Sequence, residues 1–232
     1  METSAEKIPT PSEPRRRRVA VAVLACLAAA VAAVLILGRT GEPADASAEA
    51  GFARDMAVHH AQAVEMSFIA RDGGTDEALR RLAYDIIVTQ TAQRGIFMGW
   101  LQQWELTQAS DRPPMAWMAG HGHGGGASTA ASPEASPGSA SGEAAMPGMA
   151  SEEELQRLRE ATGKEQEVLF LQLMIRHHEG GVEMAEGLLR LSDRDEVVTM
   201  ARHIVNSQSG EIKLMKDMLA QRGAQPLPSI RQ

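Results

Sequence analysis

The amino-acid sequence predicts an all-α protein, a four-helix bundle made of two duplicated helical hairpins with one separate apolar helix ahead of them. Three observations lead to this fold class. The segments 52–106 and 170–224 repeat one another without a gap, at a constant offset of 118 residues. Each copy is interrupted once by turn-forming residues. Aromatic residues make up only 3% of the chain, whereas Ala, Leu, Met, Gln and Glu are common, and this composition favours helices over strands.

Each copy of the repeat is expected to form two helices joined by a short turn. The turns are "DGGTD" at 72–76 and "LSDRD" at 191–195, where Thr75 and Ser192 are the expected N-caps of the following helices. One hairpin cannot bury its apolar stripe alone, but two hairpins packed together can. The long connection between them corresponds to ferritin-like connectivity. The predicted helices cover residues 50–71, 76–106, 164–190 and 194–222.

The connection between the hairpins is rich in Ala, Gly, Ser and Pro at residues 107–150 and is expected to be flexible. A short helix is predicted at 151–160, with Ser151 and Glu154 placed as a capping box. The expected organisation is a basic N-terminus at 1–18, an apolar helix at 19–38, a tether at 39–50, the first hairpin at 51–106, the linker at 107–150, the short helix and second hairpin at 151–224, and a tail at 225–232.

The N-terminal segment predicts export. Four arginines, Arg15 to Arg18, precede the uncharged stretch 19–38, and about 20 apolar residues suffice for a transmembrane helix. The arginines should stay in the cytoplasm, which places the rest of the chain outside. Two alternatives remain. A retained signal anchor gives a single-pass membrane protein, whereas cleavage after "ADA" at 44–46 gives a secreted one.

Charge and cysteine content narrow the function of the exported part. From Arg39 onward there are 18 Lys and Arg against 27 Asp and Glu, and an acidic domain is a poor binder of nucleic acid. Cys26 is the only cysteine and lies in the apolar helix. The exported part therefore has no thiol, so a metal site there must use histidine, methionine or carboxylate ligands.

Two similar segments, "MAVHHAQAVEM" (56–66) and "MIRHHEGGVEM" (174–184), are the strongest functional signal. At 100° per residue their histidines and methionines share the core-facing stripe of a helix, whereas Glu65 and Glu183 point to the opposite face. Methionine stands three residues before histidine four times in the chain, and side chains at this spacing share one helix face. The predicted metal ligands are Met56, His59, His60, Met66, Met174, His177, His178 and Met184.

The donor set predicts the metal. Thioether and imidazole groups without thiolate favour Cu(I), with Ag(I) as a chemical mimic. A di-iron centre in a bundle needs Glu-x-x-His motifs, and methionine occupies the place of that glutamate here. Further candidate ligands are Met115, Met118, His121, His123, Met146, Met149, Met200, His203 and Met215.

Three functional hypotheses follow from the residues. The first is a Cu(I)-binding protein without catalytic activity, whose partners are the metal ion, the membrane through its N-terminal helix, and a second copy in a homo-oligomer. The second is a structural or interaction module of the cell envelope, in which the histidines and methionines only pack a core. The third is a metal-dependent oxidoreductase, which needs carboxylates near the histidines that the spacing does not supply.

The segments "FARDMAVHHAQAVEMS", "MPGMASEEELQRLREATGKE", "FLQLMIRHHEGGVEMAE" and "ARHIVNSQSGEIKLMKDML" resemble the family known as domain of unknown function 305. The resemblance covers about residues 50–224. It implies a ferritin-like, exported or membrane-anchored bundle, and several members are associated with copper tolerance and bind Cu(I) or Ag(I) through methionine and histidine. It implicates the same eight ligands, and Met146 and Met149 match the family's middle segment.

The chain departs from the family pattern in its first half. Glu211 and Met215 of the second copy fit the pattern, but the first copy has Gln93 and Phe97 in their places. If Met215 is a ligand, the first copy lacks its counterpart and should bind metal more weakly. The expected function is Cu(I) binding or sequestration outside the cytoplasm, in metal homeostasis or copper tolerance.

Overall fold

The computed structural model describes residues 13–38, 41–119 and 146–231. These fall into two units, 1–42 and 43–232, and each is described by itself. In its described residues the first unit consists mainly of helix α1, Glu13–Gly38, which begins before the arginine block instead of after it. No helix in the described part of the chain is long and apolar enough to cross a membrane. The transmembrane or signal-anchor helix predicted at 19–38 is therefore not supported.

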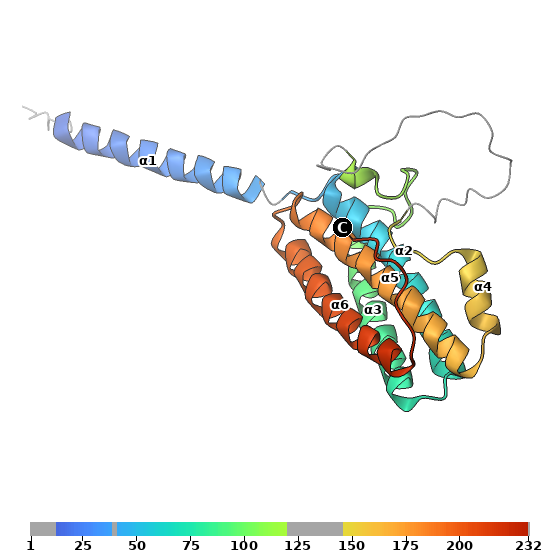
Figure 1. Ribbon diagram of the computed structural model, residues 1–232. Coiled ribbons are helices and arrows are strands. Elements are labelled where there is room, and N and C mark those ends of the chain that lie inside the picture. Colours follow the sequence, from blue (N-terminus) through green and yellow to red (C-terminus); the bar gives the residue numbers. More distant parts are fainter. Residues whose placement is uncertain (1–12, 39–40, 120–145, 232) are drawn as a thin grey trace, which may run out of the picture. The chain divides into compact units, whose positions relative to one another are not determined.

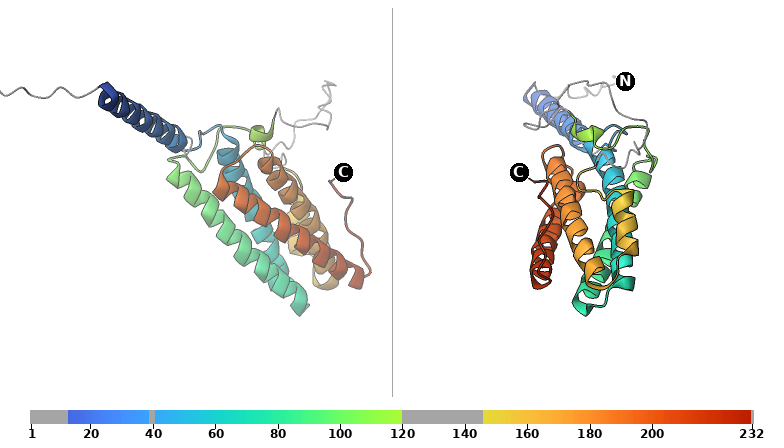
Figure 2. Two further views of the ribbon diagram at one scale, coloured as in Figure 1. Left: turned by 90° about the vertical axis from the view of Figure 1, so that its left-hand side faces the viewer. Right: turned by 45° about the vertical axis from the view of Figure 1, so that its right-hand side comes forward.

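The second unit is all-α in its described residues and consists mainly of four long helices (Figure 1). They are α2 Ala48–Gly73, α3 Glu77–Gln103, α5 Gly163–Leu189 and α6 Asp195–Gln221. Each matches a predicted helix, with ends displaced by at most three residues. The hairpins α2–α3 and α5–α6 meet through α2 and α5, and Figure 2 shows the four helices lying alongside one another.

The turns within the hairpins differ from the prediction by one or two residues. The N-cap of α3 is Asp76, whose carboxylate accepts a hydrogen bond from Leu79 N at 2.8 Å, so the predicted Thr75 cap is wrong. The hydroxyl of Thr75 instead donates to Glu167. The N-cap of α6 is Arg194, which makes no side-chain cap, so the Ser192 cap is wrong too. The hydroxyl of Ser192 instead donates a hydrogen bond to the carboxylate of Glu49 in α2. This bond connects the start of α2 to the turn of the second hairpin.

The short helix in the connection is confirmed. Helix α4, Glu152–Glu160, begins at Ser151, and the complete capping box with Glu154 is present. It packs against α2 and α5, which it reaches through the buried side chains of Leu155 and Leu158. The described ends of the predicted linker also lie against the helices: a 3-10 turn η1, Ala116–Met118, packs on α2, and Met146 is buried.

The core of the second unit is divided into two apolar clusters. The Phe52 cluster combines the first half of α2 with the second half of α5, and the Phe170 cluster combines their other halves. The two helices therefore run antiparallel. The Phe52 cluster includes Met56, Phe97, Met146, Met184 and Ile204, and the Phe170 cluster includes Met66, Ile86, Met174, Met215 and Met218.

Candidate metal centre

Four histidines form a layer between the two apolar clusters. His59 and His60 of α2, and His177 and His178 of α5, are each 0% exposed. On α2 the histidines follow residues of the Phe52 cluster and precede residues of the Phe170 cluster, and on α5 the order is reversed. The histidines therefore face the core, as the sequence predicts. We call these four side chains the histidine layer. It is unusual because a buried imidazole normally needs partners for its nitrogens.

The inner pair of the histidine layer brings the two hairpins into contact. The rings of His59 and His177 lie with centroids 3.8 Å apart and planes inclined by 34°. His59 Nε2 lies 3.1 Å from the carbonyl oxygen of Pro147, which belongs to the segment before α4. Neither nitrogen of His177 has a hydrogen-bond partner among the described residues.

The outer pair connects each hairpin's two helices through equivalent contacts. His60 Nε2 lies 2.6 Å from Gln93 Oε1 of α3, and His178 Nε2 lies 2.6 Å from Glu211 Oε2 of α6. Both partners stand 33 residues after their histidine. The duplication has therefore preserved the contact while changing the partner from an amide to a carboxylate.

These contacts indicate which nitrogen carries the hydrogen in three of the four rings, all but His177. The three partner atoms, on Pro147, Gln93 and Glu211, are oxygens that accept hydrogen bonds, so Nε2 donates in His59, His60 and His178. In a neutral imidazole the lone pair is then on Nδ1. The Nδ1 atoms of all four histidines are buried and have no hydrogen-bond partner among the described residues. Oxygen acceptors behind a histidine are the usual means by which proteins orient it toward a metal ion.

Burial keeps three of the four rings, those of His59, His60 and His177, neutral. Desolvation lowers the pKa of His59 to about 4, opposed by the hydrogen bond to Pro147. It lowers the pKa of His60 to about 3, with the charge of His59 acting in the same direction. The pKa of His177 also lies well below its ordinary value, first because of burial and then because of the neighbouring histidines. Neutral imidazoles are the form that binds metal ions.

Five methionines flank the histidine layer, and all are 0% exposed. Four of them are the predicted ligands of α2 and α5, and the fifth is Met215 of α6. Two further polar side chains, Gln90 and Gln208, are buried one turn before Gln93 and Glu211, and neither amide atom of either has a partner among the described residues. No group of three or more His, Cys, Asp or Glu side chains able to hold a metal ion occurs in the described ranges.

The other candidate ligands are distributed differently. Met146 is buried in the Phe52 cluster, and Met115, Met149 and Met200 pack against that cluster with partly buried side chains. His203 is exposed, so the structure does not bring it to the histidine layer. His121 and His123 lie outside the described residues.

The segment 146–150, which we call the strap, contacts both α2 and α5 beside the histidine layer. The amide of Gln62 holds it with two hydrogen bonds, accepting from Ala150 N at 2.7 Å and donating to Ala150 O at 2.9 Å. Two glycines permit its close approach. A Cβ on Gly180 would collide with the carbonyl oxygen of Pro147. Gly148 has φ +76°, and a Cβ there would strike the backbone of Arg176.

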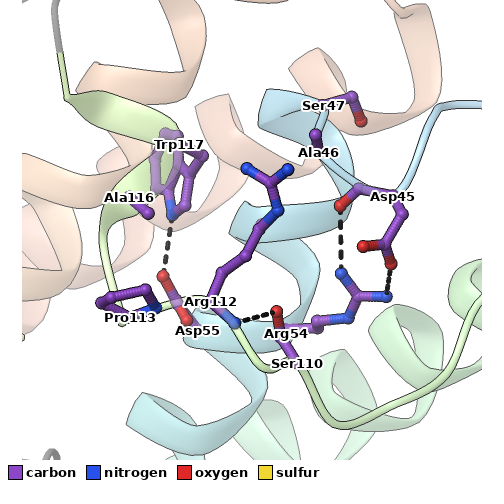
Figure 3. Close-up of a pocket in the computed structure, with 11 residues that line it drawn as sticks. Asp45, Ala46, Ser47, Arg54, Asp55, Ser110, Arg112, Pro113, Ala116 and Trp117 are labelled. Atoms are coloured by element: carbon purple, nitrogen blue, oxygen red, sulfur yellow. Dashed lines mark hydrogen bonds and ion pairs between the residues drawn. The ribbon is translucent and has the colours of Figure 1, made fainter.

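A second segment, which includes Met115 and Trp117, is attached near the start of α2 by the carboxylate of Asp55. Asp55 accepts hydrogen bonds from Met115 N at 2.7 Å and Trp117 Nε1 at 2.8 Å, and Figure 3 shows the indole directed at this carboxylate. Burial raises the pKa of Asp55, opposed by these two hydrogen bonds. The pocket beside it has a volume of about 20 Å³, which is room for one water molecule and excludes a larger ligand. The contact positions Met118 against Gly187 of α5.

The sequence did not reveal the partners of the histidines. It distinguishes Gln93 and Glu211 only as a difference between the two copies, and it predicts Pro147 to be part of a flexible linker. A usable signal existed, because each outer histidine is followed at the same spacing by a residue that can accept a hydrogen bond. Recognising it requires the register between the two helices of a hairpin, which only their packing defines.

Comparison with known proteins identifies the family. Residues 49–219 match the model of the domain of unknown function DUF305. The chain belongs to the DUF305 family. It is similar to the crystal structure of a DUF305 protein from Streptomyces coelicolor that is inferred to be secreted, with 47% identity, 79% of this chain and 99% of that chain covered, and a TM-score of 0.68. A DUF305 fragment from Deinococcus radiodurans has 31% identity, covers 75% and 96% of the two chains, and has a TM-score of 0.57.

A third similar structure carries information about ligands. The Cu(I)-bound form of CopM has 26% identity to this DUF305 protein, 75% of this chain and 96% of that chain covered, and a TM-score of 0.52. CopM has also been solved in a Cu(II)-bound form, at 27% identity. None of these structures is named as an enzyme. No curated protein sequence matches the chain significantly.

Proposed function

We propose that this DUF305 protein is exported and binds Cu(I) in the histidine layer, holding the ion away from water without catalysing a reaction. The ferritin-like pairing of its hairpins serves as the scaffold. The observation that carries the proposal is the set of four buried Nδ1 atoms that lack partners beside five buried methionines. Leaving buried polar atoms unpaired costs about 1–3 kcal/mol each, so an occupant that uses their lone pairs is expected.

The chemistry of the donors supports a soft monovalent ion. Imidazole nitrogen and thioether sulfur are ligands of Cu(I), and Cu(I) needs no carboxylate in its coordination shell. The similarity to CopM supports the same ion, since that protein has been solved with Cu(I) bound. Exclusion of water from the layer disfavours oxidation to Cu(II), which prefers harder ligands and more of them. Sequestration of copper outside the cytoplasm is the role that fits these properties.

The test replaces sulfur while keeping the core packed. In a variant with all five flanking methionines changed to leucine, the side-chain volumes stay similar and the fold is expected to persist. We expect anaerobic titration against a chromophoric Cu(I) competitor to show a loss of affinity of at least 100-fold. Met218→Leu is the matched control, because Met218 is also buried in the Phe170 cluster but is not a candidate ligand.

A second control addresses the histidines. His203 follows Met200 at the same spacing as in the buried motifs, yet it is exposed, so His203→Ala should leave Cu(I) affinity unchanged. His59→Ala with His177→Ala should reduce it strongly. If the five-methionine variant kept its helical content and its Cu(I) affinity, the proposed function would be wrong, and the histidine layer would be only part of a packed core.

A further inference from the structure

The duplication has placed different residues at the two sides of the histidine layer. On the side of the Phe170 cluster, Met66, Met174 and Met215 are buried together. On the other side, Met184 and Met56 correspond to the first two, but the residue equivalent to Met215 is Phe97. Phe97 is 0% exposed, and its ring lies 5.7 Å from that of His60. One side thus offers three thioethers and the other offers two and a phenyl ring.

The outer histidines differ in the same direction. His178 is backed by the carboxylate of Glu211, and His60 by the neutral amide of Gln93, at the same 2.6 Å distance. A carboxylate behind the ring makes the imidazole a stronger donor. It also supplies a negative charge close to a monovalent ion, and a buried cation without a counter-charge is unfavourable. Gln93 supplies no such charge.

We propose that the histidine layer has two unequal Cu(I) sites, one on the side of each apolar cluster, and that the ion binds first on the side of the Phe170 cluster. The tighter site uses Met66, Met174, Met215 and His178, with Glu211 as a positioning residue and counter-charge. The weaker site uses Met56, Met184 and His60, with Gln93 behind it. The inner histidines lie between the two. This inference rests on the proposed function and adds the order of loading and its cause.

The order of loading is read directly by NMR of the full-length chain with ¹³C-labelled methionine methyl groups. Cu(I) is diamagnetic, so each methyl resonance reports its own site. Assignment uses single leucine replacements of Met215 and Met56. During an anaerobic titration, the resonances of Met66, Met174 and Met215 should complete their shift within the first equivalent, and those of Met56 and Met184 should shift afterwards.

Exchanging the residues that differ between the two copies tests whether they cause the difference in affinity between the two sites. Glu211→Gln with Met215→Phe gives the second half the composition of the first, and the tighter step should weaken by about 10- to 100-fold, the usual effect of altering groups behind a metal ligand. Gln93→Glu with Phe97→Met is the reciprocal variant, and its weaker step should tighten by about 10-fold or more. Far-ultraviolet circular dichroism confirms that both variants fold.

The outcomes separate this inference from the function on which it rests. Simultaneous shifts of all five methionines, or loading of Met56 and Met184 first, overturn the inequality while leaving Cu(I) binding intact. If the exchange variants bind Cu(I) with the same affinities as the wild type in both binding steps, the assigned cause of the inequality is wrong, and Cu(I) binding itself again remains intact. Absence of any Cu(I) binding by the wild-type chain overturns the proposed function and the inference together.

Discussion

At the scale of single residues, three buried histidines of this protein are held neutral by their surroundings. His59, His60 and His177 have lowered pKa values because burial disfavours the imidazolium form. In the unfolded chain the same rings titrate near 6.5. Between that pH and the lowered native values, the unfolded state binds more protons than the native state. The free energy of unfolding therefore falls as the pH is lowered through this interval.

This difference predicts acid lability of the metal-free protein. The contribution of His59, His60 and His177 to stability is fully present above pH 6.5. Below that, each of these three histidines should remove about 1.4 kcal/mol per pH unit, down to its native pKa. Urea denaturation at pH 7.0, 6.0 and 5.0 measures the slope. His177→Leu should make the slope shallower, whereas His203→Ala should not, because that ring is exposed. Equal slopes for His177→Leu and the wild type would contradict the assignment.

A second residue-scale prediction concerns Asp55. Asp55→Ala removes the acceptor for Met115 N and Trp117 Nε1, and Met115 sits in the left-handed region at φ 64°, which costs about 1–3 kcal/mol without support. We expect residues 110–119 to detach locally while the four long helices keep their stability. Faster amide exchange and proteolysis confined to this segment would show it. Asp85→Ala is the control, because Asp85 is exposed on α3; equal protection in the two variants would rule the contact out as an anchor.

At the scale of elements, the strap is the part that sequence reasoning misplaced. Its composition, with Pro147 and Gly148 adjacent, resembles that of the linker before it. What fixes its position is not local preference but contacts with residues far along the chain, such as Gln62 and Gly180. Such contacts cannot be found until α2 and α5 are placed side by side. The long helices were predictable, in contrast, because their apolar periodicity and turns are local signals.

The strap yields a prediction with an internal control. Gly148→Ala should lower the thermal stability and release the contact between Pro147 and His59, because the alanine has both an unfavourable φ and a collision with the backbone of Arg176. Gly163→Ala has a similar positive φ of 54° but nothing within 4 Å of the added Cβ, so it should cost only about 1–2 kcal/mol. Denaturant titration compares the two variants. A smaller loss for Gly148→Ala than for Gly163→Ala would mean that the strap is not held as described.

At the scale of the whole molecule, one layer of polar side chains joins all four long helices. His60 and Gln93 connect α2 to α3, His178 and Glu211 connect α5 to α6, and the inner histidines connect the two hairpins. The sequence predicted that the histidines and methionines face the core, and their complete burial confirms it. It could not predict that the rings of His59 and His177 meet, since that depends on how one hairpin docks on the other.

Because the layer spans both hairpins, Cu(I) should stabilise the molecule as a unit. At free Cu(I) 100-fold above the dissociation constant, the free energy of unfolding should rise by about 2.7 kcal/mol for one site. Hydrogen exchange should slow in the middle turns of α2, α3, α5 and α6 together. The variant with five leucines should show neither effect. Protection restricted to one hairpin would mean that the two halves bind independently of one another.

The complete enclosure of the histidines has a kinetic consequence. An ion inside the layer touches no bulk water, so it exchanges only as often as the packed cover opens. The residence time of the metal is then set by the opening equilibrium of the segments over the layer as well as by the strength of its bonds. The strap is held by few contacts compared with a long helix, and a loosened strap should therefore shorten the residence time more than it weakens the equilibrium affinity.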